Sequence, residues 1–72
     1  MKIFVFKTDI KSNLEVSILA RALRDLRGIV RWSVDMQDVD RVLKIVTLED
    51  SRESDFVSFV RSHGIFCESL PD

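Results

Sequence analysis

The polar stretch KTDIKSNLEV, residues 7–16, carries oxygen-bearing side chains at a spacing that suits two kinds of chemistry. Asp9, Ser12 and Glu15 offer oxygens to a hard cation, but Ca²⁺ takes about six to eight oxygen ligands and three side chains do not supply them. Ser12 and Glu15 also form S-x-x-E, the capping box, in which each side chain accepts a hydrogen bond from the other residue's backbone N–H. We therefore expect a helix that begins at Ser12 rather than a hard-metal site.

Three arginines follow at intervals of three residues, at Arg21, Arg24 and Arg27. A solvated helix face explains them, because cations near the end of a helix are favoured by its dipole. The alternative is a docking surface for an acidic protein partner, and we take these arginines as the candidate partner surface. The stripe is too sparse for nucleic acid, and a net charge of −1 supplies no overall field that would recruit nucleic acid or an anionic membrane.

The other residues with chemical potential are His63 and Cys67. His63 falls in the last turn of an expected helix, where the dipole favours a cation. Cys67 falls in an expected strand, where a cysteine is more often a small buried apolar group than a reactive thiol. The two do not make a zinc pattern. No Ser-His-Asp, Cys-His or H-E-x-x-H spacing occurs, so we predict no catalytic residue, no enzyme activity and no cofactor.

Length and composition limit the remaining possibilities. The 72 residues suffice for one domain, residues 1–72, near the lower limit for independent folding. Hydrophobic residues make up 46% of the chain, with two glycines and one proline, which favours compact regular structure. A single cysteine excludes an internal disulfide, and the apolar run IFVF is too short for a signal peptide or a membrane span. We therefore expect a cytoplasmic protein in a reducing compartment.

Hydrophobic periodicity predicts six elements in the order βαββαβ. Alternating, β-branched runs indicate strands, and a 3.6-residue repeat of apolar residues indicates two amphipathic helices. This order is typical of the ferredoxin-like α+β sandwich, in which two helices cover one face of a four-stranded antiparallel sheet. The strands are expected at residues 2–7, 29–36, 41–49 and 65–70, and the helices from residue 12 to a stop at Gly28 and over residues 51–63.

The pattern also predicts helix ends and strand faces. Gly28 is expected at the left-handed C′ position of the first helix, and Asp50 or Ser51 at the N-cap of the second. The second strand should have one apolar face. The third should have apolar residues on both faces, and the outward set could support a homodimer or a partner contact. The second-strand set is Val30, Trp32, Val34 and Met36, and the third-strand sets are Leu43 with Ile45 and Val42 with Val46 and Leu48.

The apolar residues of the first helix follow Glu15 at intervals of four, eight and eleven places, at Leu19, Leu23 and Leu26, and Gly28-Ile29 comes next. In this register the chain resembles the heavy-metal-associated domain, the small fold of copper chaperones and metal-pump tails. That family carries M-x-C-x-x-C, then apolar residues at these intervals, then Gly-Val. The segments WSVDM and SHGIFCESL are similar to its second strand and its closing segment, so the resemblance covers nearly the whole chain.

The chain departs from the family's pattern where relatives bind metal. Ser12 and Glu15 stand at the positions of the two cysteines, and Ile10 replaces the methionine. Thiolates bind soft ions such as Cu(I) because sulfur is polarizable, whereas a serine hydroxyl stays protonated and a carboxylate is a hard donor. The resemblance therefore implies a degenerate member, with no metal ligands expected and soft-metal binding unfavourable. We interpret Ser12 and Glu15 as a former metal site that has become a helix cap.

These observations predict a small non-enzymatic protein-interaction module. Its partner would be an unidentified protein or a second copy of the chain. The alternative is a metal-homeostasis protein with weak or residual metal-ion binding through other ligands. The residues that we expect to matter are Ser12 and Glu15 at the helix start and Arg21, Arg24 and Arg27 on the candidate partner surface.

Overall fold

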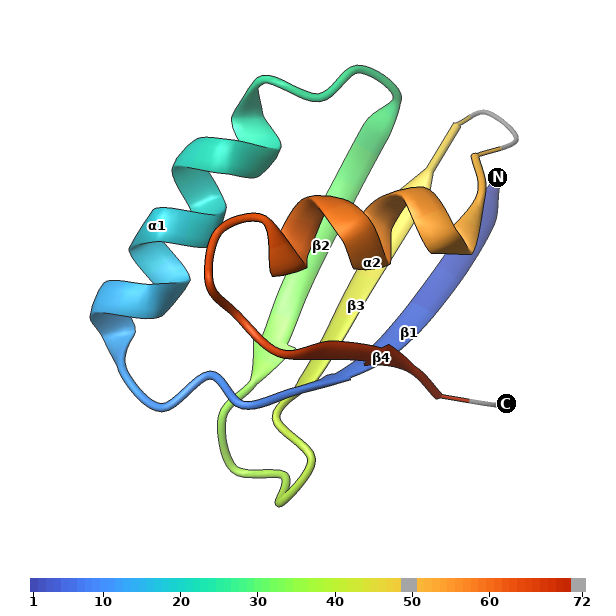
Figure 1. The fold of residues 1–72 in the computed structure, drawn as a ribbon. Coiled ribbons are helices and arrows are strands. Elements are labelled where there is room, and N and C mark those ends of the chain that lie inside the picture. Colours follow the sequence, from blue (N-terminus) through green and yellow to red (C-terminus); the bar gives the residue numbers. More distant parts are fainter. Residues whose placement is uncertain (49–50, 71–72) are drawn as a thin grey trace.

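The computed structural model describes residues 1–48 and 51–70. Six elements follow one another in the predicted order βαββαβ (Figure 1). β4 is shorter than expected, and within the described residues no helix is long and apolar enough to cross a membrane. The elements are β1 Lys2–Thr8, α1 Asn13–Arg24, β2 Ile29–Asp35, β3 Val42–Thr47, α2 Glu53–Arg61 and β4 Cys67–Ser69.

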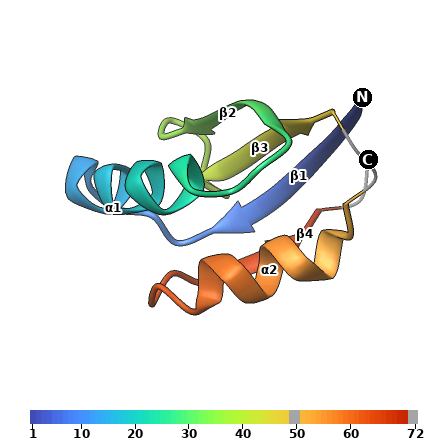
Figure 2. The same ribbon diagram turned by 90° about the horizontal axis from the view of Figure 1, so that it is seen from above.

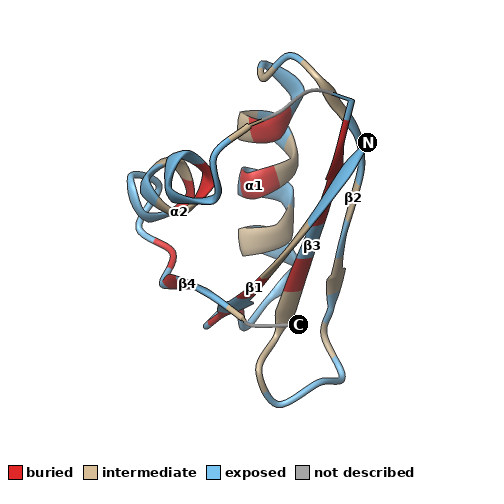
Figure 3. Ribbon diagram, turned by 90° about the vertical axis from the view of Figure 1, so that its right-hand side faces the viewer, coloured by how far each residue is buried: buried red, intermediate tan, exposed pale blue. Residues whose placement is uncertain are grey.

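The four strands form one antiparallel sheet in the spatial order β2-β3-β1-β4. β1 and β3 are central, and β2 and β4 form the two edges. Both helices lie on the same side of the sheet, and no helix covers the opposite face (Figure 3). The predicted ferredoxin-like α+β sandwich is therefore confirmed.

The core lies between the helices and the inner face of the sheet. Successive side chains of a strand point to opposite faces, so every second residue of β1 and β3 points towards the helices. The inner stripes of the two helices supply the remaining apolar side chains. The buried core consists of Phe6, Ile10, Leu19, Leu23, Leu43, Ile45, Phe56, Val60, Ile65 and Cys67.

β3 has apolar residues on both of its faces, as predicted. Leu43 and Ile45 are completely buried on the helix side. By alternation, Val42 and Val46 belong to the opposite, helix-free face. Val46 is only 8% exposed there, whereas Leu48, just beyond the strand, is 67% exposed. The outward set is thus Val42, Val46 and Leu48.

A β-bulge at the start of β2 corrects the predicted alternation. Ile29 lies opposite Thr47 of β3 and Arg31 lies opposite Val46, so Val30 is an extra residue between two successive pairs. The alternation predicts Val30 on the inner face, but Val30 is 50% exposed and Ile29 packs against the core instead. Beyond the bulge, the rest of the predicted apolar face does pack against the core.

The helix ends also differ from the predictions. α1 has Asp25 as its C-cap, so Gly28 is not the C′ residue; it lies in the following turn, where its φ of 85° directs the chain into β2. Arg52 takes the N-cap position of α2 without a side-chain hydrogen bond, so Ser51 lies one residue too early. Asp50 lies outside the described residues. Where each helix begins and ends depends on the backbone angles of the flanking residues, and residue type alone does not determine those angles.

Thr8 ties the end of β1 to two other segments. Its buried Oγ1 donates a hydrogen bond to the carbonyl of Arg41 at 2.6 Å and accepts one from the N–H of Ile10 at 3.3 Å. Its backbone N–H donates to the carbonyl of Asp40 at 3.0 Å. Arg41 has a φ of 44°, in the left-handed region that is unfavourable for a residue with a side chain. Thr8 therefore helps to hold this strained turn between β2 and β3.

Thr8→Val should lower the free energy of unfolding by about 1–3 kcal/mol, because it leaves the carbonyl of Arg41 and the N–H of Ile10 without their partner. Thr8→Ser keeps the hydroxyl and loses one methyl group, at a cost of about 1 kcal/mol. Urea denaturation of both variants measures the difference. A valine variant at least as stable as the serine variant would contradict this account of Thr8.

Candidate functional site

α1 begins at the S-x-x-E pattern. Ser12 is the N-cap, with extended backbone angles, and its Oγ accepts a hydrogen bond from the N–H of Glu15 at 3.3 Å. The Glu15 Oε1 accepts from the N–H of Lys11 at 2.8 Å, rather than from that of Ser12. Ser12 thus caps the helix as predicted, and the second bond of the capping box is displaced by one residue because the carboxylate reaches the preceding N–H. The carboxylate also meets the positive end of the helix dipole.

Loop 1, residues 9–12 between β1 and α1, is held by contacts from outside itself. Ile10 is completely buried in the core, and its N–H bonds to the Thr8 hydroxyl. The Asp9 Oδ1 accepts a hydrogen bond at 3.0 Å from the N–H of Phe66, 57 residues away in the sequence. Loop 1 is therefore fixed to the core, to β1 and to the segment before β4.

The donor set at loop 1 does not fit a soft metal ion. Ser12 and Glu15 offer a hydroxyl and a carboxylate, and both accept hydrogen bonds from the backbone. Ile10, which the sequence resemblance aligns with the family's methionine, is buried and has no sulfur. Within residues 1–48 and 51–70, no three His, Cys, Asp or Glu residues are grouped so that they could hold a metal ion. The arrangement suits a helix cap.

Cys67 is buried on β4 opposite Thr8 of β1, which confirms it as a small core residue. Burial raises the pKa of its thiol to about 11, against the lowering effect of the Arg61 charge. The thiol is therefore protonated at neutral pH, and a protonated thiol is a poor nucleophile and a poor metal ligand.

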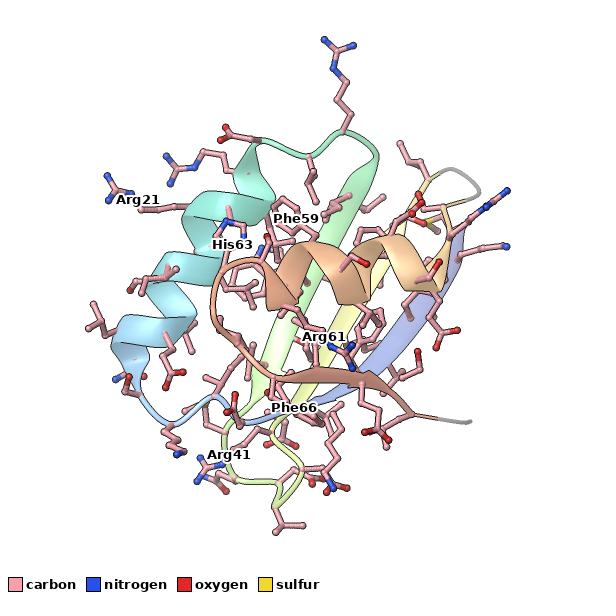
Figure 4. All side chains as sticks on the ribbon, viewed as in Figure 1. Arg21, Arg41, Phe59, Arg61, His63 and Phe66 are labelled. Atoms are coloured by element: carbon pink, nitrogen blue, oxygen red, sulfur yellow. The ribbon has the colours of Figure 1, made fainter. Side chains whose placement is uncertain are left out.

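His63 lies two residues beyond the end of α2 rather than in its last turn. Its ring packs on Phe59 with the centroids 4.8 Å apart, and its Nδ1 lies 2.9 Å from the Phe59 carbonyl oxygen (Figure 4). The Phe59 carbonyl also accepts a hydrogen bond from the Ser62 hydroxyl at 2.6 Å, and it can accept a second from His63 when Nδ1 carries the proton. This position gives no indication of a metal site shared by His63 and Cys67.

The candidate arginine surface is split between α1 and the turn that follows. Arg21 and Arg24 lie in the last turns of the helix, Arg27 lies beyond it, and all three are exposed. Figure 4 shows Arg21 extending away from the rest of the protein. Within the described part of the chain, the three guanidinium groups make no hydrogen bond or ion pair. They remain a candidate surface.

Leu14 and Ile18 are surface residues that the sequence interpretation missed. Leu14 is 70% exposed and Ile18 is 41% exposed, although both are large and apolar. They lie four residues apart on α1 and Arg21 follows after three more, so the three side chains share one helix face. This α1 strip, Leu14, Ile18 and Arg21, points away from the buried stripe of Leu19 and Leu23. Its signal in the sequence is two apolar residues out of phase with that stripe.

The comparisons with known proteins establish the fold of this chain. No protein-family model and no curated protein matches this sequence. In three dimensions, however, the chain has the fold of the heavy-metal-associated domain, as the sequence resemblance predicts.

Three solved structures illustrate the likeness. A chain in the Atx1–Cu(I)–Ccc2a complex superposes with a TM-score of 0.86 at 14% identity, over 100% of this chain and 99% of that chain. The yeast copper transporter domain Ccc2a gives 0.83 at 14% identity, again over 100% and 99%. A copper binding domain from HMA7, a P-type ATPase, gives 0.78 at 17% identity, over 99% and 96%. At these identities the likeness establishes the fold.

Ser12→Ala should lower the free energy of unfolding by about 1 kcal/mol, because the N–H of Glu15 loses its acceptor at the helix start. Ser17→Ala is the matched control, since Ser17 is exposed inside α1 and alanine favours the helix there. Denaturation midpoints of the two variants provide the measurement. An unchanged midpoint for Ser12→Ala would show that the observed hydrogen bond contributes nothing to stability.

The double variant Ser12→Cys and Glu15→Cys should gain Cu(I) binding, because it places two thiolates at the family's ligand positions. Competition with a coloured Cu(I) chelator measures the affinity. The two single variants and the unchanged protein are the controls, and all of them retain the buried Cys67. Equal affinity in the double variant and these controls would show that the register with the family is wrong.

Proposed function

We propose that this chain is a non-enzymatic protein-interaction module, and that a protein partner binds the α1 strip. The observation that carries the proposal is the exposure of Leu14 and Ile18 on the helix face that also bears Arg21. Single exposed apolar residues are common on protein surfaces. Two such residues one helical turn apart, beside an arginine, combine an apolar anchor with a cation.

The chemistry of the strip indicates the chemistry of the partner. Arginine and large apolar residues contribute strongly to binding in protein interfaces. Arg24 adds positive charge beside the strip, and Arg27 lies in the turn beyond the helix. A partner segment with an apolar side chain flanked by carboxylates would complement both features, with the charges chiefly raising the rate and specificity of association.

The hydrogen bonds of loop 1 support a surface that needs no metal. Leu14 lies two residues after the N-cap Ser12, whose bond to Glu15 fixes the start of the helix. The strip is therefore in place without a bound ion. A solved structure of the same fold shows a complex between two proteins, Atx1 and Ccc2a with Cu(I), which supports a protein partner here. The single buried cysteine is consistent with action in the cytoplasm.

Substitution in the strip should weaken partner binding. Arg21→Glu, and separately the pair Leu14→Ser and Ile18→Ser, should each reduce affinity about tenfold, or ~1.4 kcal/mol. Lys44→Glu is the matched charge control, because Lys44 is exposed on β3, whose outward residues lie on the helix-free face. Immobilised variants are compared for proteins retained from a cell extract, and the affinity of each purified candidate is then measured. A partner that binds every variant equally would contradict docking on the strip.

The alternative, weak metal binding through other ligands within metal homeostasis, is tested separately. NMR titrations with Cu(I), Zn²⁺ and Ca²⁺ under reducing conditions should leave residues 9–15 unchanged. Saturable shifts centred on loop 1 would favour the metal-binding function over the protein-interaction module.

A further inference from the structure

β2 is the longer of the two edge strands of the sheet. It is a seven-residue strand with β3 on one side, and Figure 2 shows no helix or strand beyond its other side. β4, at the opposite edge, has three residues. Short edge strands resist pairing with another chain because they offer few free backbone groups. β2 has no such protection over its regular part.

The regular part of β2 is the run Arg31–Asp35. The bulge at Val30 interrupts the ladder before this run, and bulges hinder edge pairing locally. Between Arg31 and Asp35, however, each residue pairs in regular order with β3 from Val46 to Val42. Five consecutive residues therefore present a straight edge to a further strand.

The charges of this run are self-complementary. Arg31, Ser33 and Asp35 alternate onto the helix-free face, with Ser33 midway between the two charges. If a second copy of β2 lies antiparallel with Ser33 opposite Ser33, Arg31 of each copy lies opposite Asp35 of the other. Opposite charges directly across an antiparallel pair are stabilising. One two-fold axis thus creates two ion pairs from a single sequence.

The helix side of the same run suits the same pairing. Trp32 and Val34 point to that side, are partly exposed, and pack against the core. In the register centred on Ser33, Trp32 of one copy lies opposite Val34 of the other, and aromatic with β-branched pairs are favourable across strands. No charged side chain of the run points to this side. An open groove lined by residues of α1 and β2, among them Trp32, lies at this edge.

From this complementarity we propose that β2 pairs antiparallel with β2 of a second copy of the chain, centred on Ser33, and joins the two sheets into one. The proposal is independent of partner binding on α1. Arg31, Trp32, Val34 and Asp35 set the register, because a shift by two residues in either direction removes both Arg31–Asp35 pairs. The interface is small, so we expect a weak, concentration-dependent dimer.

The test is a pair of single variants that cannot pair with themselves and can pair with each other. Arg31→Glu places a second carboxylate opposite Asp35, and Asp35→Lys places a second cation opposite Arg31, so each variant alone should dimerise about tenfold or more weakly. In the mixture, both cross-strand pairs have opposite charges, and the heterodimer should form with about the affinity of the unchanged protein. Sedimentation equilibrium over a range of concentrations measures dimers of twice the 8.3 kDa chain mass.

The controls separate this interface from folding and from the α1 strip. The Asp35 Oδ1 also accepts hydrogen bonds from the N–H groups of Gln37 and Asp38, so recovery of Asp35→Lys in the mixture shows that the variant is folded. Arg21→Glu changes the charge equally and should leave the dimer intact, although it should weaken partner binding.

Three results would overturn the proposed pairing. The first is an unchanged protein that stays monomeric up to millimolar concentration. The second is a mixture that associates no better than the two variants alone. The third is a set of concentration-dependent NMR shifts centred on Ile3, an exposed β1 residue that pairs with Val46 on the helix-free face, instead of on Arg31–Asp35. Arg21 is not part of the proposed β2 interface, so loss of partner binding in Arg21→Glu does not change these three outcomes. Partner binding on the α1 strip and pairing through β2 can therefore be refuted separately.

Discussion

The hydrogen bonds at the end of β1 determine how the candidate site is presented. The Thr8 hydroxyl joins loop 1 to the strained turn at Arg41 through two hydrogen bonds. The Asp9 carboxylate accepts a hydrogen bond from the N–H of Phe66. Ile10 is buried beneath the same loop. The Thr8 hydroxyl is buried, and leaving a buried polar group without a partner costs more than a hydrogen bond gains, so its two hydrogen bonds favour one position of the loop. α1 begins directly after loop 1, so the position of loop 1 also sets the position of the exposed strip on α1.

The helix cap gives a physical account of the two positions that the sequence resemblance aligns with the family's cysteines. Ser12 and Glu15 satisfy two backbone N–H groups at the start of α1, with an oxygen acceptor for each. A bound ion is not needed to order this segment, and the donors present are the wrong kind for a soft metal. The fold shared with copper-binding domains is therefore compatible with a different use of the same surface.

Patterns that repeat along the chain predict most of the fold. The spacing of Leu19 and Leu23 on α1 and the alternation through Leu43 and Ile45 on β3 both report which face is buried, because helices and strands have fixed periods. A capping residue is similarly local, since Ser12 and Glu15 are three residues apart. Element order and the helix start could thus be obtained from residue types alone. Features that depend on a neighbouring strand could not be obtained in this way. Val30 is exposed because it is the extra residue of a β-bulge against β3, and the alternation of β2 alone does not reveal a bulge.

The sequence by itself determined the order of the elements, the buried stripes and the absence of a C-x-x-C motif, because each is local or periodic. The tertiary structure alone decided which face of β3 is free of helices, that β2 forms an edge, and that Leu14 and Ile18 remain exposed. Exposure is a relation between a side chain and everything packed near it. Residues of one type, such as Leu14 and Leu19, therefore take opposite roles on the same helix.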